Sequence, residues 1–330
     1  MVEPMQTRST PAGQEKAAVR QSFIDRHRAS LARLLPLTGL VGLVVFFWIT
    51  GGDRFMSVDN WRTLIQQAAV VAIVGFGLTF VIVAGSIDLS VGSVAALAGI
   101  VAAGVAEANG ALLGVVAGMA TGAACGFCNG FVLAIMRVPS FIATLGMLSV
   151  ARGLTLVYSH NEPKVVTGFD GLGTEPGIYY VLVGAFVLSF VLFNVTSFGR
   201  YTRAIGGDER VSRLSGVPMR RMKIAIFAIA GMMAGLGGVV LSARLGVATP
   251  NAATGFELTA ITAVLLGGTP LTGGVGNIWN TIIGAVIIQI LANGLVILGV
   301  SPEMQEIFQG VVLVLAVFVA LERRKIGVIK

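Results

Sequence analysis

Two cysteines, Cys125 and Cys128, stand in the Cys-x-x-Cys spacing of many redox and zinc sites. Both lie inside an apolar stretch, and no histidine or acidic residue is near them in sequence to complete a metal shell. His160 likewise has no partner at metal-site spacing. We therefore predict no metal site, and we expect both cysteines to pack on one helix face as small residues.

Several polar side chains interrupt the long apolar stretches, where such groups are costly and need a reason. Asp88 either caps a helix that begins near Ser90 or acts as a gate on a pathway through the protein. Deeper amides either bind the hydroxyl groups of a solute or tie helices together. Arg152 either extends toward the outer surface or an outer carboxylate, or lines the pathway. The candidate pathway or gate residues are Asp88, Ser90, Asn129, Gln289 and Asn293.

The elements that must position these residues are membrane helices. Of the 330 residues, 55% are apolar and only 12% are charged, and many apolar stretches approach the ~20 residues that a helix needs to cross a bilayer. We predict an all-α membrane protein, a polytopic bundle of about ten transmembrane helices. Frequent glycines such as Gly75 and Gly77 indicate closely packed helices. No paired catalytic groups occur, so we predict a protein that is not an enzyme.

The predicted spans are Leu34 to Thr50, Leu64 to Ala84, Val91 to Glu107, Ala111 to Met136, Phe141 to Tyr158, Ile178 to Val195, Ile224 to Leu245, Glu257 to Gly267, Ile278 to Leu298 and Ile307 to Leu321. The eighth is too short to span alone. Either Gly255 and Phe256 extend it, or it is a broken helix that other parts of the protein cover.

Ten spans put both termini on one side of the membrane, and the positive charges indicate which side. Most of the 23 Lys and Arg residues fall before residue 34, at Arg137, within 200–223 and within 323–330. Lys and Arg are retained in the cytoplasm, so both termini are predicted to be cytoplasmic. This pattern explains the net charge of +7 without nucleic-acid binding.

The domain organisation follows from these spans. Residues 1–33 are polar and lack an apolar core followed by a cleavage site, so we predict a cytoplasmic tail and not a signal peptide. Residues 34–321 form the transmembrane domain, and residues 322–330 form a second cytoplasmic tail. A weak sequence similarity between residues 84–93 and residues 266–275 suggests an internal repeat, because both segments follow a span that crosses the membrane in the same direction.

The longest predicted cytoplasmic loop, residues 196–222, contains start and stop signals for a helix. Gly206 and Gly207 give a turn, and Asp208 is a favourable N-cap residue. Gly216 and Pro218 end the helix. The result is a two-turn helix of roughly 12 Å, whose apolar side is expected to consist of Ala204, Val211 and Leu214. A solvated basic loop is the alternative.

A short rigid helix at the cytoplasmic face would pass motion from a nucleotide-driven partner into the bundle. The chain has no Gly-x-x-x-x-Gly-Lys-Ser/Thr phosphate loop, so any ATP must be used by another subunit.

This loop and four further motifs make the chain resemble the ribose-type permeases of bacterial ATP-binding-cassette (ABC) importers, from about residue 60 to 322. The motifs are Gly-Ser-Ile-Asp-Leu-Ser-Val-Gly-Ser (85–93), Asn-Gly-Phe-Val-Leu-Ala (129–134), Pro-Ser-Phe-Ile-Ala-Thr-Leu-Gly-Met (139–147) and Pro-Asn-Ala-Ala-Thr-Gly-Phe-Glu-Leu-Thr-Ala-Ile-Thr-Ala-Val (250–264). Ser86 stands where the family often has glycine, a small departure.

The resemblance implies a permease in the bacterial inner membrane that imports ribose or a similar monosaccharide by alternating access. Its implied partners are ABC ATPase subunits, which use ATP and Mg, a periplasmic sugar-binding protein, a second permease copy and the lipid bilayer; the chain itself carries no cofactor. The implied ATPase-coupling residues are Gly206, Gly207, Asp208, Glu209, Arg210, Ser212, Arg213, Leu214, Ser215 and Gly216.

Charged outer residues are candidates for docking the binding protein, although ordinary solvation of loops explains them equally well. They are Arg54, Arg62, Lys164, Arg244 and Glu257. Related permeases for nucleosides or branched-chain amino acids are the nearest alternatives. A stand-alone transporter driven by ions is a further one, but it needs an intramembrane carboxylate, and the few acidic residues of the spans lie near helix ends.

Overall fold

The structure, a computed structural model, describes residues 37–325 of the chain. The predicted tail 1–33 and the first residues of the first predicted span lie outside the described residues. The predicted tail 322–330 begins inside the last described helix, whose backbone continues to Lys325.

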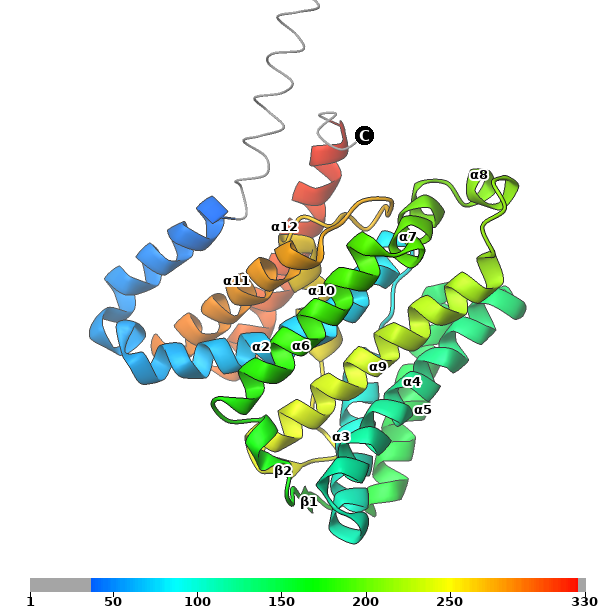
Figure 1. The fold of residues 1–330 in the computed structure, drawn as a ribbon. Coiled ribbons are helices and arrows are strands. Elements are labelled where there is room, and N and C mark those ends of the chain that lie inside the picture. The colour runs from blue at the N-terminus through cyan, green and yellow to red at the C-terminus, as the bar shows by residue number, and fades with distance from the viewer. Residues whose placement is uncertain (1–36, 326–330) are drawn as a thin grey trace, which may run out of the picture.

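Within residues 37–325, eight helices are long and apolar enough to cross a membrane. They are the Leu37–Met56 helix, α2 (Val58–Val83), α3 (Val91–Asn109), α4 (Ala111–Ile135), α5 (Ser140–Ser159), α6 (Gly177–Phe190) with its continuation η2 (Val191–Val195), α9 (Met219–Leu245) and α11 (Ile278–Ile297). Two further elements complete the bundle, the short α10 (Phe256–Leu266) and the long α12 (Pro302–Lys325) (Figure 1). The predicted all-α polytopic fold is confirmed.

Helix α2 is the centre of the bundle. Every residue from Ala68 to Val83 is buried, and the helix packs against α9, α11, α10 and α6. A helix that is apolar on all sides belongs inside a protein. Glycine allows close contact with α9, because a Cβ on Gly77 would come within 2.9 Å of the Cα of Ala230.

A stripe of glycines sets the packing of α4. Gly114, Gly118, Gly122, Gly126 and Gly130 recur every four residues along it and therefore share one face. Gly122 lies against the backbone of Gly231 in α9, and a Cβ on Gly130 would come within 2.7 Å of the Cα of Ile224. The backbones of α4 and α9 thus approach each other more closely than larger side chains would allow.

The connections gather on two opposite faces of the bundle (Figure 1). One, here called the α8 face, contains α7 (Ser197–Gly207) and α8 (Glu209–Leu214). The other, the β face, contains η1 (Asp170–Leu172) and the strands β1 (Lys164–Val165) and β2 (Val247–Ala248). These strands pair antiparallel, with Lys164 opposite Ala248, and join two loops that are far apart in sequence.

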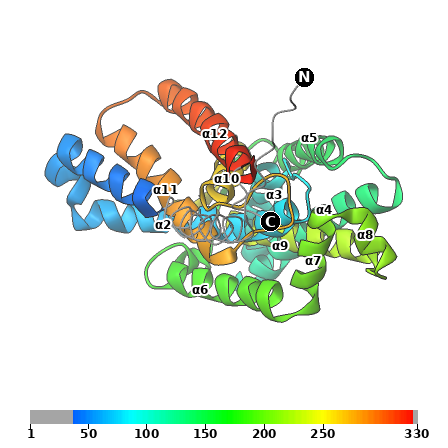
Figure 2. The same ribbon diagram turned by 90° about the horizontal axis from the view of Figure 1, so that it is seen from above.

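Two helices begin inside the bundle rather than at a face. Ala95, one turn into α3, already packs against Gly238 in the second half of α9. The start of α10 lies at the same depth, because a Cβ on Gly92 would come within 2.6 Å of the carbonyl oxygen of Ala253. Figure 2 shows α10 and α3 between α12 and α5. Two non-helical segments, residues 84–90 and 249–255, therefore run within the bundle.

The observed helices differ from the predicted spans at several positions. The eighth span is α10, an 11-residue helix of about 16 Å, which supports the broken-helix alternative. The first helix ends at Met56 instead of Thr50, and only Ser57 separates it from α2. Helix α7 and the β1–β2 pair were not anticipated.

The glycine stripe gives a test of the packing. Replacing Gly126 by Ala puts a Cβ against the carbonyl group of Phe227, and such overpacking costs about 1–3 kcal/mol. We expect a lower melting temperature for Gly126→Ala in detergent solution, measured by thermal unfolding of the purified protein.

Gly146→Ala in α5 is the matched control, since a Cβ there meets no atom within 4 Å. Equal melting temperatures for the two variants would contradict the close packing of α4 on α9.

Candidate functional site

The short helix α8 forms as its sequence signals predict. Asp208 adopts an extended conformation between α7 and α8, and its carboxylate accepts a hydrogen bond of 2.9 Å from the backbone nitrogen of Val211. Val211 and Leu214 are 57% and 81% exposed. Ala204 belongs to α7, so it does not share their face. An exposed apolar pair on so small a helix is a surface suited to a protein partner.

The predicted coupling residues are divided between two helices and their junctions. Gly206 and Gly207 end α7, Asp208 is the N-cap residue of α8, and Glu209, Arg210, Ser212, Arg213 and Leu214 lie in α8, with Ser215 and Gly216 after it. Ser212 is buried, whereas Glu209, Arg210, Arg213 and Leu214 face outward.

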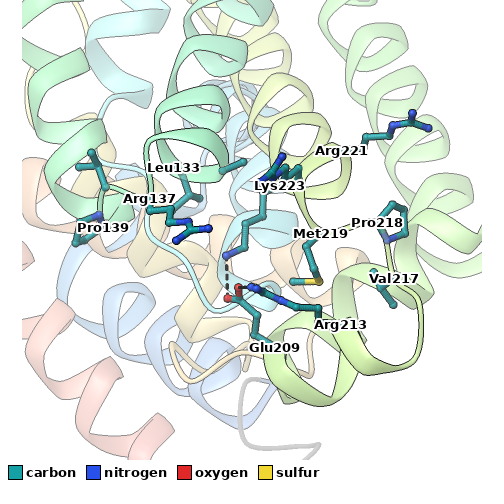
Figure 3. Close-up of a pocket in the computed structure, with 13 residues that line it drawn as sticks. Leu133, Arg137, Pro139, Glu209, Arg213, Val217, Pro218, Met219, Arg221 and Lys223 are labelled. Carbon is teal, nitrogen blue, oxygen red and sulfur yellow. Dashed lines mark hydrogen bonds and ion pairs between the residues drawn. The ribbon is translucent and has the colours of Figure 1, made fainter.

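A basic cleft of about 620 Å³ separates α8 from the α4–α5 connection (Figure 3). Its charged lining is Arg137, Arg213, Arg220, Arg221, Lys223 and the single carboxylate of Glu209. Lys223 Nζ donates to Glu209 at 2.8 Å, and Arg213 donates at 3.1 Å. The hydrogen bond from Lys223, with the nearby positive charges, lowers the pKa of Glu209 below its ordinary value. Glu209 thus ties α8 to the first turns of α9 while the cleft keeps an excess of positive charge.

Helix α7 connects α8 to the interior through a junction of glycines. A Cβ on Gly206 would collide with the carbonyl oxygen of Val83 at the end of α2. Gly274, in the α10–α11 connection, donates its backbone nitrogen to the same oxygen at 2.8 Å. Gly273 lies against Gly85 just after α2. The two segments of the suggested repeat therefore meet at the end of α7.

Three of the candidate pathway residues form one buried chain of hydrogen bonds. Asn129 Nδ2 donates to Ser90 Oγ at 2.9 Å, and Ser90 Oγ lies 2.6 Å from Asp88 Oδ1, to which it donates. Asp88 Oδ1 also accepts from the backbone nitrogen of Ser90 at 2.8 Å, at the start of α3. Asp88 is 1% exposed and therefore buried. The carboxylate thus stabilises the segment that leads into α3.

Arg152 of α5 holds the other non-helical segment. Its Nη1 donates to the carbonyl oxygens of Pro250 at 2.6 Å and Ala252 at 3.0 Å. These backbone partners were not expected from the sequence. The carboxylate of Glu257, which the sequence placed among the outer charged residues, also interacts electrostatically with Arg152. Carbonyl groups inside a membrane protein need hydrogen-bond partners, and a guanidinium group with several donors supplies them.

The remaining two candidate pathway residues have different surroundings. Asn293 of α11 forms a reciprocal amide pair with Asn60 of α2, with N–O distances of 2.8 and 3.1 Å. It ties two helices, which is one of the two roles considered for it. Gln289 instead lines a cavity between α10, α11 and α12.

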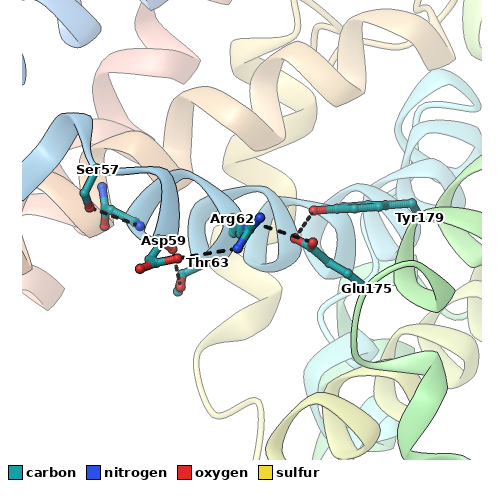
Figure 4. A network of polar contacts seen from close by, with 7 residues as sticks. Ser57, Asp59, Arg62, Thr63, Glu175 and Tyr179 are labelled. Carbon is teal, nitrogen blue, oxygen red and sulfur yellow. Dashed lines mark hydrogen bonds and ion pairs between the residues drawn. The ribbon is translucent and has the colours of Figure 1, made fainter.

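The charged residues predicted to dock a binding protein do not form one cluster. Arg62 lies 3.6 Å from Asp59 and 3.9 Å from Glu175, which also accepts a hydrogen bond from Tyr179 (Figure 4). Arg54 lies at the end of the first described helix, Lys164 in β1 and Arg244 in the last turn of α9. Glu257 does not lie on the outer loops but in the first turn of α10, against Gly92 inside the bundle.

The two cysteines do not share a buried face. Cys125 is buried and Cys128 is exposed, and both are free thiols. The predicted packing role therefore holds for Cys125 only.

Comparisons with known proteins agree with the multi-pass membrane fold. The family described as the permease component of branched-chain amino acid transport systems matches residues 60–317. The ribose import permease protein RbsC of Escherichia coli K12 is 41% identical over 315 residues, which cover 91% of this chain and 98% of that protein. No solved structure matches.

Two further relatives bear similar names. RbsC of Bacillus subtilis 168 is 40% identical over 310 residues, covering 89% of this chain and 94% of that protein. The fructose import permease protein FrcC of Rhizobium meliloti is 33% identical over 310 residues, covering 89% and 86%. The chain belongs to this family of multi-pass transporter permeases, and the resemblance to its ribose-type members is confirmed.

Sequence reasoning missed the roles of Arg152, Asn60 and the α7 glycines. Arg152 and its carbonyl partners are 98 and 100 residues apart, and Asn60 and Asn293 are 233 apart. The available signal was the cost of a charged group in an apolar stretch, which indicates that a partner exists but does not identify it.

The contacts of Arg152 give a test. Arg152→Met leaves the carbonyl groups of Pro250 and Ala252 without their donor, so we expect a loss of about 2 kcal/mol in the free energy of unfolding. Arg152→Lys should retain part of that stability. Chemical denaturation in detergent micelles measures both.

The control is Arg62→Met, because the Arg62 side chain is 58% exposed and its ion pairs are long. Exposed pairs contribute about 0–1 kcal/mol. An equal effect of the Arg62 and Arg152 changes would refute the role assigned to Arg152.

Proposed function

We propose that the chain is the membrane permease of an ABC importer that carries a monosaccharide, ribose or a similar sugar, into the cell. The observation that carries this proposal is the near-complete match to permeases named for ribose and fructose import. The exposed helix α8, which has apolar side chains and adjoins a basic cleft, supports it independently. A protein driven by a separate ATPase needs such a surface.

The α8 face is the cytoplasmic face in this proposal. The cations of 200–223 and Arg137 gather there, as the retention of positive charge in the cytoplasm requires. In Figure 1, the start of the Leu37–Met56 helix and the end of α12 point toward the same face. Both termini would then be cytoplasmic, and the β face would receive a periplasmic binding protein.

Coupling would begin at α8 and pass through α7. The partner ATPase contacts Val211, Leu214 and the cleft, and its ATP-driven movement shifts α8 and α7 together. The end of α7 touches the end of α2 and the α10–α11 connection through Gly206. A shift there moves α10 and α11 against the rest of the bundle, which opens the pathway alternately to the two sides.

Further partners follow from the same proposal. ABC ATPase subunits use ATP and Mg, a periplasmic sugar-binding protein delivers the solute, and a second permease copy completes the membrane part. Arg54, Arg62, Lys164 and Arg244 remain candidates for binding-protein contacts, and Asp88, Ser90 and Asn129 for a gate where α3 begins.

The description of the family names branched-chain amino acids, so an amino-acid permease is the second candidate. An amino acid carries an ammonium and a carboxylate group, and both need charged or strongly polar partners when desolvated. The polar side chains of the cavity beside Gln289 are mainly uncharged, which favours a solute without ionised groups.

Reconstitution tests the proposed activity. We expect proteoliposomes containing the permease, its copurified ATPase and its binding protein to accumulate labelled D-ribose, D-fructose or L-arabinose only when ATP is supplied to the ATPase. Collapse of proton and sodium gradients should have no effect. Uptake that continues without the ATPase would contradict an ABC importer and favour an ion-coupled transporter.

Substitution at α8 tests the coupling surface. Leu214→Asp places a charge on the 81% exposed apolar position of α8, so we expect at least about a tenfold loss of ATP-driven uptake, since 1.4 kcal/mol of lost contact is tenfold in an equilibrium constant. The melting temperature of the isolated permease should be unchanged, because the side chain makes little contact within it. Leu214→Met, which keeps the apolar surface, is the control. Wild-type uptake by both variants would remove α8 from the coupling surface.

A further inference from the structure

A second cavity, of about 320 Å³, lies between α10, α11 and α12. Its polar side chains are Thr259, Gln289, Gln305, Glu306 and Gln309. Apolar side chains, among them Phe256, Ile288 and Leu291, complete the wall. The volume lies at the lower end of the ~300–1,000 Å³ range of small-ligand sites.

The cavity adjoins the middle of the bundle. Gln289 is near the centre of the 20-residue α11. Phe256 and Thr259 belong to the first turn of α10, which begins inside the bundle. Transporters commonly bind their solutes beside a helix that is interrupted near the middle of the membrane.

The hydrogen bonds of the polar side chains leave much of their capacity unused. Gln309 Nε2 donates to Thr259 Oγ1, and Gln305 Nε2 donates to the carbonyl oxygen of Val300 at 2.8 Å. Both bonds use the amide nitrogen, so both amide oxygens are left to accept. Gln289 makes no hydrogen bond to any residue in the described range.

Another amide side chain of α11, that of Asn293, does have a hydrogen-bond partner. Asn293, one turn from Gln289, is fully engaged with Asn60 by two hydrogen bonds. Gln289 is half-buried and lines the cavity, so its amide group is not enclosed without a partner in an apolar environment. Interhelical pairing therefore accounts for Asn293, whereas the amide of Gln289 is available to a molecule in the cavity.

We propose that this cavity binds a neutral, polyhydroxylated solute during transport, with Gln289 as the central hydrogen-bonding residue. An amide group both donates and accepts, which matches a sugar hydroxyl, and the apolar wall suits the C–H faces of a sugar ring. Among the described residues, no Lys or Arg lines the cavity, so these residues offer no partner for an anionic solute. This inference rests on the proposed function, because the solute class is that of a sugar importer.

Thiol protection tests the site directly. In a variant with Cys125→Ser and Cys128→Ser, Ala292→Cys, at another lining position of the cavity, is treated with a methanethiosulfonate reagent in the purified full-length permease. We expect saturating D-ribose, D-fructose or L-arabinose to slow the modification at least about threefold, whereas glycine betaine at equal osmolarity has no effect. Val296→Cys is the control, because Val296 is on the same helix but is 58% exposed and outside the cavity. Equal rates with and without sugar at position 292 would overturn the proposal.

Transport separates this inference from the function on which it rests. Gln289→Met keeps the length of the side chain but removes its hydrogen-bonding groups, and we expect uptake by the reconstituted complex to fall about 3- to 10-fold, the value of one or two hydrogen bonds. Wild-type uptake of a sugar with no change in Gln289→Met would overturn the site alone. If the wild-type complex takes up none of the three sugars, the proposed function fails and the site assignment fails with it.

Discussion

The need to pair every backbone polar group within the hydrocarbon region is the constraint on which the rest of this structure depends. A bundle of complete helices satisfies it automatically, whereas this bundle contains two non-helical segments, residues 84–90 and 249–255. Asp88 accepts from the backbone where α3 begins, and Arg152 donates to two carbonyl groups before α10. Two charged side chains that look costly in an apolar sequence thus stabilise the places where helices are interrupted.

Close backbone approach is the second feature that organises the bundle. Glycines on α4 and α9 bring these helices together, and Gly206 brings α7 against the carbonyl oxygen of Val83. A contact between backbones has no flexible side chain to absorb a displacement. In the proposed mechanism, movement of α7 would therefore reach α2 and the α10–α11 connection with little loss, because packed interfaces shift between discrete arrangements and do not deform continuously.

The sequence predicted the features that depend on neighbouring residues. Apolar length located the spans, and the start and stop signals around Asp208 and Gly216 located α8. Features that depend on distant residues were not predictable. Nothing near Arg152 in sequence identifies the carbonyl groups of Pro250 and Ala252, and nothing near Gln289 shows that Gln309 and Thr259 lie beside it. Helix α7 was missed because glycines usually end helices, and Gly206 and Gly207 were interpreted as a turn. In the structure they occupy the last turn of α7, where Gly206 packs closely against the backbone of Val83.

The proposed coupling surface and the proposed solute cavity are linked through α7 and the connection between α10 and α11. The connection between these helices touches the end of α7 through Gly273 and Gly274, and the helices themselves form two walls of the cavity. A complete, rigid α10 would anchor that cavity to both faces of the membrane. In the proposed mechanism α10 would tilt with the connection, because it is short and begins at a hydrogen-bonded but non-helical segment. The interruption that Arg152 stabilises would then also permit a change in cavity shape when α8 moves.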